Sequence, residues 1–211
     1  MQATESAIIV VFNAGLLKYG GDLYVGSMTI MQSLMQMTFV PLQGFTYGVQ
    51  PIISYNYGAK NFDRVRSAIK RMVAVSFIGS VIMGIVVPAF PRTFGLMFTN
   101  SPEMLDLLAK VLPIYFAAVW IFGLQVGAQS TFLALGRSKM SLFVALLRKV
   151  ILLIPLALIL PNFLGVMGIY ISEPIASTTS AITATILLII CYKKLRKEEK
   201  QESIADASGR S

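Results

Sequence analysis

The sequence has 211 residues, of which 55% are hydrophobic and only 13% charged, against roughly 25% charged in an average soluble domain. Its formal net charge is +8, but the charges form short clusters between long apolar runs, which indicates a polytopic membrane protein and argues against a nucleic-acid-binding surface. One cysteine and no histidine exclude a disulfide framework and a thiol or imidazole metal site, which leaves carboxylates, amides, hydroxyls and aromatic rings as the available chemistry.

The first apolar run, residues 7–17, is too short to cross a bilayer alone. Counting from Met1 gives about 17 residues, the lower limit for a membrane helix. We therefore expect this span to begin before Met1, and the absence of a basic start and of a cleavage site argues against a signal peptide. Glu5 lies in this span, and a carboxylate placed in a membrane helix suggests function because its burial is costly.

The second span, residues 23–59, is an uncharged stretch of 37 residues. As one helix it would be about 55 Å long, against a hydrocarbon core of about 30 Å. Pro41 and Pro51 remove backbone donors, and the spacing of Gly44 and Gly48 allows another helix to approach closely. The sequence predicts one long, kinked helix whose end leaves the bilayer.

Polar residues of the second span share one face. At 100° per residue its four glutamines fall within about 40° of one another, with a tyrosine nearby. Amides face lipid only at high cost, because hydrocarbon offers no hydrogen-bond partners, so we expect an aqueous cleft here; packing between helices is the alternative. The residues concerned are Gln32, Gln36, Gln43, Tyr47 and Gln50.

A basic loop is predicted after Gly58, before a third span that runs from Met72 to about Phe90. An outer loop through Asn100 follows, and the acidic and basic residues from Glu103 to Lys110 are expected to form a solvated rim. The loop's five cations indicate a cytoplasmic position; they are Lys60, Arg64, Arg66, Lys70 and Arg71.

The fourth span is predicted over residues 111–135. Gly123 and Gly127 form a GxxxG pattern, which we interpret as close packing against a neighbouring helix. Gln125 and Gln129 share a face and join the candidate cleft.

The fifth span is predicted to begin at Met140 and to carry Arg148 and Lys149. Such cations usually reach back to the membrane interface, and the alternative is an Arg148 that faces the cleft. The sixth span covers residues 166–192 and contains Glu173 directly before Pro174. Residues 1–192 thus form one helical bundle, and the charged tail, 193–211, is expected to be disordered.

The distribution of basic residues supports six spans with both termini in the cytoplasm. In that arrangement fifteen of the eighteen Lys and Arg residues lie inside, and only Lys18, Arg92 and Lys110 lie outside. This asymmetry is the one expected from the positive-inside rule. The predicted fold is therefore an all-α, multi-pass protein of the plasma membrane.

Several motifs resemble one family. A span ending in VQPIISYNYGAKNFDRVRSAIKR is similar to the signature loop of the multidrug and toxic compound extrusion (MATE) transporters, and within them to the MepA-type branch. MQATESA at the start, FLALGRSKMS at 132–141 and the end of the last span resemble the same family in the same order, to about residue 200. Family members have two six-helix lobes of the MOP superfamily type, so the resemblance implies a C-terminal lobe whose partner is an N-terminal lobe.

The resemblance also implies a role for Glu5. In the family, a glutamate in the first span of the second lobe belongs to the cation-binding region, and Glu5 in ATES has the matching place. The best-known sodium-coupled members carry an aspartate in the fourth span, where this chain has only Gly123, Leu124 and Gln125, and this difference favours proton coupling. Glu173 is a second coupling candidate or, equally, a structural acceptor for a neighbouring helix. Burial favours the neutral form of either carboxyl group, which would allow a proton to be exchanged for cargo.

The sequence therefore predicts half of a multidrug efflux antiporter that exports amphipathic organic cations, driven by H⁺ or Na⁺, with no other cofactor and with membrane lipids around it. An enzyme is not expected, because the sequence has no HExxH and no GxSxG motif. One alternative is a flippase for lipid-linked glycans, for which only Arg148 and Lys149 are candidate cleft cations. The other alternative is an inactive truncated fragment.

Overall fold

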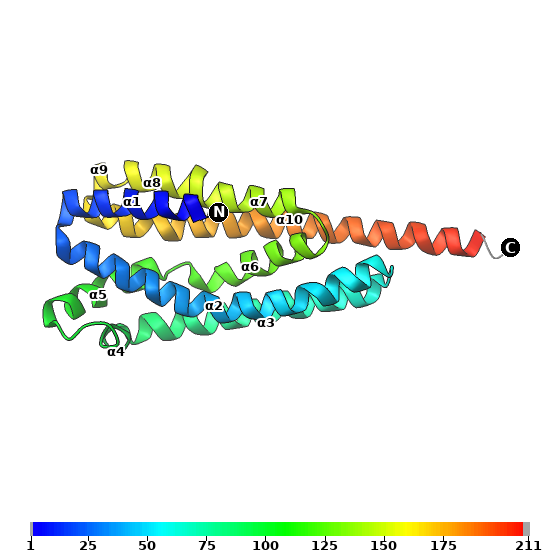
Figure 1. Ribbon diagram of the computed structural model, residues 1–211, viewed down its shortest axis with the longest axis horizontal. Coiled ribbons are helices and arrows are strands. Elements are labelled where there is room, and N and C mark those ends of the chain that lie inside the picture. Colours follow the sequence, from blue (N-terminus) through cyan, green and yellow to red (C-terminus); the bar gives the residue numbers. More distant parts are fainter. Residues whose placement is uncertain (1, 209–211) are drawn as a thin grey trace.

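The computed structural model describes residues 2–208, with side chains from Ile8 to Gln201, and every regular element in this range is a helix. The helices run along the long axis of the molecule (Figure 1). Their bounds are α1 Gln2–Gly20, α2 Asp22–Gly58, α3 Phe62–Ala89, α4 Pro91–Gly95, α5 Pro102–Tyr115, α6 Val119–Ala134, α7 Ser138–Leu146, a π-helix Leu147–Leu153, α8 Ile154–Ile159, α9 Pro161–Leu164 and α10 Val166–Ser208.

Within residues 2–208 the chain passes six times along the molecule: through α1, α2, α3, α5 with α6, α7 to α9, and α10 (Figure 1). By length and apolarity, three of these segments can cross a membrane, namely α3, residues 138–164 and residues 166–201 of α10, and the bent pair of α5 and α6 makes a fourth. The described apolar part of α1, Ile8–Gly20, is shorter. α2 is long enough, but its glutamines and hydroxyls lower its apolar character. The fold is that of a polytopic all-α membrane protein.

α2 agrees with the long helix predicted from the sequence, because both Pro41 and Pro51 lie inside its 37 residues. The two glycines between these prolines differ from the expectation. A Cβ atom added at Gly44 or Gly48 would have no neighbour within 4 Å in the described part of the chain. Whatever approaches this face of α2, it is not another helix of this bundle.

The basic loop is much shorter than predicted. α2 ends at Gly58 and α3 already begins at Phe62, ten residues before the predicted start of the third span. Lys60 adopts a left-handed backbone conformation (φ 59°), and the backbone N–H of Asn61 donates to the carbonyl of Asn56 (2.9 Å), so the chain reverses within three residues. The cations from Arg64 onward consequently lie on the first turns of α3.

The predicted fourth span is broken. α5 and α6 are separate helices that meet at an angle of 53°. At the break the backbone N–H of Ala117 donates to the carbonyl of Ile114 (3.2 Å) and that of Val119 to the carbonyl of Phe116 (3.0 Å), so the chain turns more tightly there than in an α-helix. α5 begins at Pro102 and so includes the predicted rim from Glu103 to Lys110, and its Asp106 forms an exposed ion pair with Arg92 (2.5 Å), as expected for that rim.

α10 continues well past Tyr192, where the sequence predicts the end of the span and a disordered tail. The reason lies in contacts with other elements. Glu198 accepts from the Tyr57 hydroxyl (3.2 Å) and from Arg137 (3.4 Å), and Glu199 pairs with Arg66 (2.9 Å). These contacts hold the extension against α2, α3 and the turn between α6 and α7.

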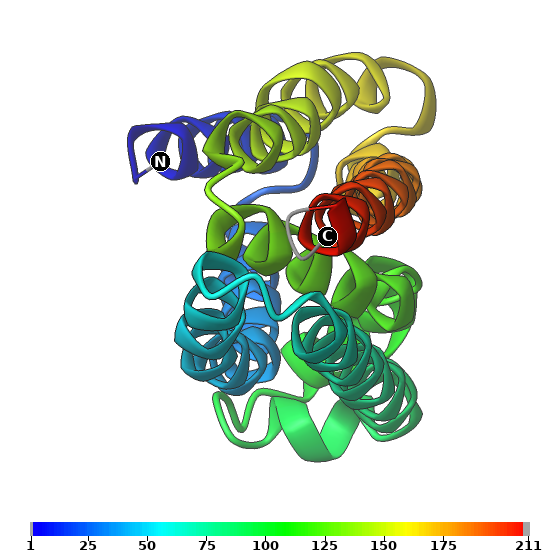
Figure 2. The same cartoon turned by 90° about the vertical axis from the view of Figure 1, so that its right-hand side faces the viewer.

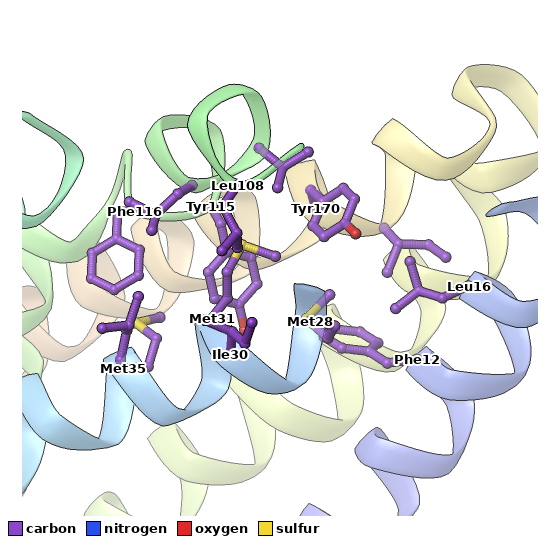
Figure 3. Packing of buried hydrophobic residues seen from close by; sticks show 14 of the residues in the cluster. Phe12, Leu16, Met28, Ile30, Met31, Met35, Leu108, Tyr115, Phe116 and Tyr170 are labelled. Carbon is purple, nitrogen blue, oxygen red and sulfur yellow. The ribbon is translucent and has the colours of Figure 1, made fainter. Parts of the chain in front are cut away.

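Two hydrophobic clusters lie at opposite ends of the bundle. One joins α1, α2, α5 and α10, and Figure 3 shows Phe12, Met31, Tyr115 and Tyr170 among its members. The other joins α2, α3, α6 and the end of α10 around Phe132. We call the second end, with the α2–α3 and α6–α7 turns, the basic end. Viewed from there, α6 lies in the middle of the bundle (Figure 2).

Candidate functional site

A cavity of about 780 Å³ borders the first hydrophobic cluster, whose Phe12, Met35 and Tyr115 line it. Its walls come from α1, α2, α5, α6, α7, the π-helix and α10, and it extends along α7 as far as Ser138 near the basic end. Six of the seven side chains that the sequence assigned to a cleft line it. They are Gln32, Gln36, Gln43, Tyr47, Gln125 and Gln129.

Gln50 is the seventh, and it does not line the cavity. It lies on the same face of α2 but one turn beyond Tyr47, the last residue of α2 in the wall. Its amide nitrogen is buried without a hydrogen-bond partner among the described residues. The depth at which the cavity ends along α2 was not visible in the sequence.

The α2 wall presents amides and one phenol. Gln36, Gln43 and Tyr47 are exposed, and Gln32 is half-buried. The opposite wall belongs to α6. There Gln129 donates to the backbone carbonyl of Ser141 (3.3 Å), which fixes its amide group and joins α6 to α7.

Gln125 is the most buried glutamine of the cavity, with an exposed fraction of 1%. Its amide oxygen has no hydrogen-bond partner within the described part of the chain. A buried acceptor without a partner is costly, so this oxygen is suited to accept from a donor that enters the cavity or to contact a cation there.

The charged part of the cavity is an ion pair between the π-helix and α10. Glu173 is 3% exposed and accepts from the guanidinium group of Arg148. Ser177, one turn further along α10, donates to the same carboxylate oxygen (3.0 Å) and accepts from Nε of Arg148 (3.3 Å). The guanidinium carbon also lies 4.4 Å from the centre of the Phe122 ring, a cation–π distance.

The ion pair corrects the expectation for Arg148. The sequence favoured a side chain that reaches back to the membrane interface, whereas the structure turns it into the cavity, with only 14% of the side chain exposed. The buried carboxylate of Glu173 compensates the positive charge of Arg148 inside the bundle, so the side chain does not have to extend to the membrane interface. The signal available in the sequence was the presence of opposite charges on consecutive antiparallel spans.

Local backbone irregularities surround this pair. Arg148 and Lys149 lie in the seven-residue π-helix, a rare conformation that often occurs at functional sites. On the other side, Pro174 follows Glu173 and cannot donate to the carbonyl four residues earlier. The regular α-helical hydrogen bonding is therefore altered on both sides where the charged side chains meet, although α10 continues through Pro174.

The described lining residues carry three cations and one carboxylate: Lys139, Arg148, Lys149 and Glu173. Glu5, the other carboxylate singled out in the sequence, lies outside the residues whose side chains the structure describes. Ile8 and Phe12 of the same helix line the cavity.

Comparisons with known proteins identify relatives of about twice this length. The family model MatE matches residues 1–159. The multidrug export protein MepA of Staphylococcus aureus (strain NCTC 8325 / PS 47) is 26% identical over 187 residues, which are 88% of this chain and 41% of that protein. Protein DETOXIFICATION 36 of Arabidopsis thaliana is 28% identical over 117 residues, 56% of this chain and 23% of that protein.

A solved structure has the same fold. The outward-facing conformation of a multidrug resistance MATE family transporter of the MOP superfamily superposes with a TM-score of 0.84 at 18% identity, over 93% of this chain and 44% of that one. The chain therefore spans less than half the length of the relatives it matches, which is the extent of one lobe.

Proposed function

The chain belongs to the MATE family of transporters, and we propose that it is the second, C-terminal lobe of a multidrug efflux antiporter that is driven by H⁺ or Na⁺. The observation that carries this proposal is the cavity, whose amide and aromatic walls end at a buried carboxylate. Aromatic rings and amides bind varied amphipathic molecules, and a carboxylate attracts a positive group. An N-terminal lobe would close the other side, and rocking of the two lobes in the plasma membrane would give alternating access.

Coupling is assigned to Glu5 and Glu173. A carboxylate that alternately binds a cation and releases it couples ion flow to export, because the two states favour different conformations. Arg148 already compensates the charge of Glu173, so a proton or an organic cation reaches that carboxylate only when the pair separates. The amide oxygen of Gln125, buried without a hydrogen-bond partner among the described residues, could contact a sodium ion in the cavity. Glu5 has the position that the family resemblance gives to the cation site.

A second candidate function is the transfer of an anionic, lipid-linked glycan. It is favoured by Lys139, Arg148 and Lys149 in the cavity wall, one cation more than the sequence suggested. A diphosphate headgroup would need such cations, whereas an organic cation would be repelled by them unless Glu173 and the partner lobe outweigh them.

The decisive experiment is transport in everted membrane vesicles. The chain is co-expressed with an N-terminal lobe of the family, and uptake of ethidium is followed under an imposed proton gradient and, separately, a sodium gradient. Ethidium uptake under either gradient supports the antiporter and identifies the ion. If neither the chain alone nor the chain with the partner lobe takes up ethidium, the interpretation as an inactive fragment is supported. Transfer of a fluorescent lipid-linked glycan in place of ethidium would favour the flippase.

The same assay tests Glu5. A glutamine of equal size keeps the hydrogen bonds but cannot titrate, so Glu5→Gln should abolish ion-driven uptake while the amount of protein in the membrane stays unchanged. Uptake at the wild-type rate under both gradients would remove Glu5 from the coupling mechanism.

A further inference from the structure

A second cavity, of about 500 Å³, lies at the basic end, outside the transport site. Two facing helices build it. The α3 side chains recur at spacings of three and four residues and therefore share one face, and the α10 side chains are four residues apart. The lining residues are Asp63, Arg66, Ser67, Lys70, Tyr192 and Arg196.

Ion pairs hold the two walls in place. Arg66 bridges Asp63 on its own helix (2.5 Å) and Glu199 on α10 (2.9 Å). On α10, the neighbouring Glu198 is held by Tyr57 and Arg137. The α10 wall is thus fixed by three other elements, so the cavity is a built feature of the fold.

The donors that line the cavity suit a phosphate group. Arg66, Lys70 and Arg196 supply cationic N–H donors, and Ser67 and Tyr192 supply hydroxyl groups. Asp63 is the one carboxylate in the wall, and it is already paired with Arg66. The wall therefore keeps a positive balance from Lys70 and Arg196, both of which are exposed.

The position of the cavity favours a lipid as the source of that phosphate. It lies where the charged turns of α3 and α10 give way to their apolar parts, which is the depth of the headgroups for a membrane protein. Deeper along the same helices, exposed apolar side chains continue from it, with Ile189 about one turn and Ile78 about two turns away. A headgroup in the cavity would leave its acyl chains along this apolar surface.

We propose that this cavity binds the phosphate headgroup of an anionic phospholipid and so ties the α10 extension to the membrane surface. Basic pockets between membrane helices at the cytoplasmic side are suited to such headgroups. The proposal goes beyond the transport function and does not depend on it, because none of these six residues lines the transport cavity.

The test is native mass spectrometry of the full chain in detergent, with phosphatidylglycerol and phosphatidylcholine of identical acyl chains. The wild type should retain phosphatidylglycerol in preference to phosphatidylcholine. The double variant Lys70→Gln/Arg196→Gln should bind phosphatidylglycerol about 30-fold more weakly, since each cation near a membrane surface contributes about 1 kcal/mol.

Arg64→Gln/Lys193→Gln is the matched control. It removes one cation from each of the same two helices, outside the cavity, and should bind phosphatidylglycerol within about threefold of wild type if the cavity determines binding. The charge-preserving Lys70→Arg/Arg196→Lys should retain binding, and circular dichroism checks that each variant folds.

Three results would overturn the proposal. They are equal losses in the cavity variant and the control variant, no preference between the two lipids in the wild type, and binding of inorganic phosphate by the wild type without retention of phosphatidylglycerol. The last result would assign the cavity to a soluble phosphate compound.

Discussion

At the scale of single residues, the pair of Arg148 and Glu173 makes each partner dependent on the other. Both side chains are largely buried beside the cavity, so removing one strands the charge of the second. Breaking a fully buried pair costs about 3–5 kcal/mol, and access to the cavity should reduce this to about 2–3 kcal/mol. Glu173→Gln and Arg148→Met should therefore each lower the thermal unfolding temperature in detergent.

The double variant Arg148→Met/Glu173→Gln should recover most of that loss, because no uncompensated charge remains. Arg92→Gln provides the control: it breaks the exposed pair with Asp106 and should cost about 0–1 kcal/mol. If the double variant is as unstable as the sum of the single ones, the two side chains are not coupled as the structure indicates.

Gln36 tests the cavity without touching any charge. It is exposed in the α2 wall, where a substrate would meet its amide group. Gln36→Leu should change the relative uptake of different organic cations in the vesicle assay by about tenfold, because a substrate loses one hydrogen-bonding partner, while the amount of protein in the membrane remains the same.

Gln50→Leu is the matched control, since Gln50 is on the same face of α2 but beyond the cavity. It should leave the substrate profile unchanged. Equal shifts in both variants, or a loss of protein without a shift, would mean that the glutamines serve packing between helices.

At the scale of helices, the two GxxxG patterns have different environments. A Cβ at Gly123 would overlap the backbone oxygen of Ser76 and the hydroxyl of Ser80 on α3, whereas one at Gly48 would meet nothing within 4 Å. Gly123→Ala should therefore lower the free energy of unfolding by about 1–3 kcal/mol. Gly48→Ala should leave it unchanged or raise it by up to about 1 kcal/mol, because alanine is the better helix former.

Thermal unfolding of the Gly123→Ala and Gly48→Ala variants in detergent tests both expectations. A Gly48→Ala variant that is less stable than Gly123→Ala would contradict the packing of α6 on α3. If Gly48→Ala is stable but lowers transport once the N-terminal lobe is present, this face of α2 is the one that meets the other lobe.

Helix boundaries show which features a single sequence can predict. The continuity of α2 through Pro41 and Pro51 could be predicted from its lack of charge. An uncharged segment inside a bilayer must satisfy its own backbone hydrogen bonds, and a helix does so. The early start of α3 and the extension of α10 depend on a three-residue turn and on ion pairs with distant residues. Contacts between residues far apart in the chain do not appear in local hydropathy.

The candidate site also has features that a single sequence can predict and features that it cannot. The face of each helix could be predicted, since 3.6 residues per turn fixes it, and six of the seven residues chosen by this argument line the cavity. The sequence could not predict that Arg148 is the partner of Glu173, or that the cavity ends before Gln50. Both features depend on how α2, α10 and the π-helix are placed relative to one another.

At the scale of the whole molecule, the basic clusters at residues 60–71, 137–139 and 193–200 lie at the same end. The exception is the pair Arg148 and Lys149, which lines the cavity. The α2–α3 turn, the α6–α7 turn and the α10 extension meet at the basic end, where their ion pairs lie. The connection from α3 to α5 lies at the opposite end (Figure 1). The fold alone leaves open which end faces the cytoplasm. The concentration of Lys and Arg at the basic end predicts that this end does, although Arg148 and Lys149, counted inside from the sequence, line the cavity.

Cysteine labelling in intact cells tests this orientation. In a Cys191→Ser background, which removes the chain's one native thiol, Asn61→Cys and Ser138→Cys should resist a membrane-impermeant maleimide added from outside, because both positions lie at the basic end. Asn100→Cys, in the connection between α4 and α5, should react with it. Permeabilised cells provide the control, since all three cysteines should then be labelled. Reaction of residue 61 in intact cells, with residue 100 protected, would reverse the orientation and place both the basic end and its phosphate-binding cavity outside the cell.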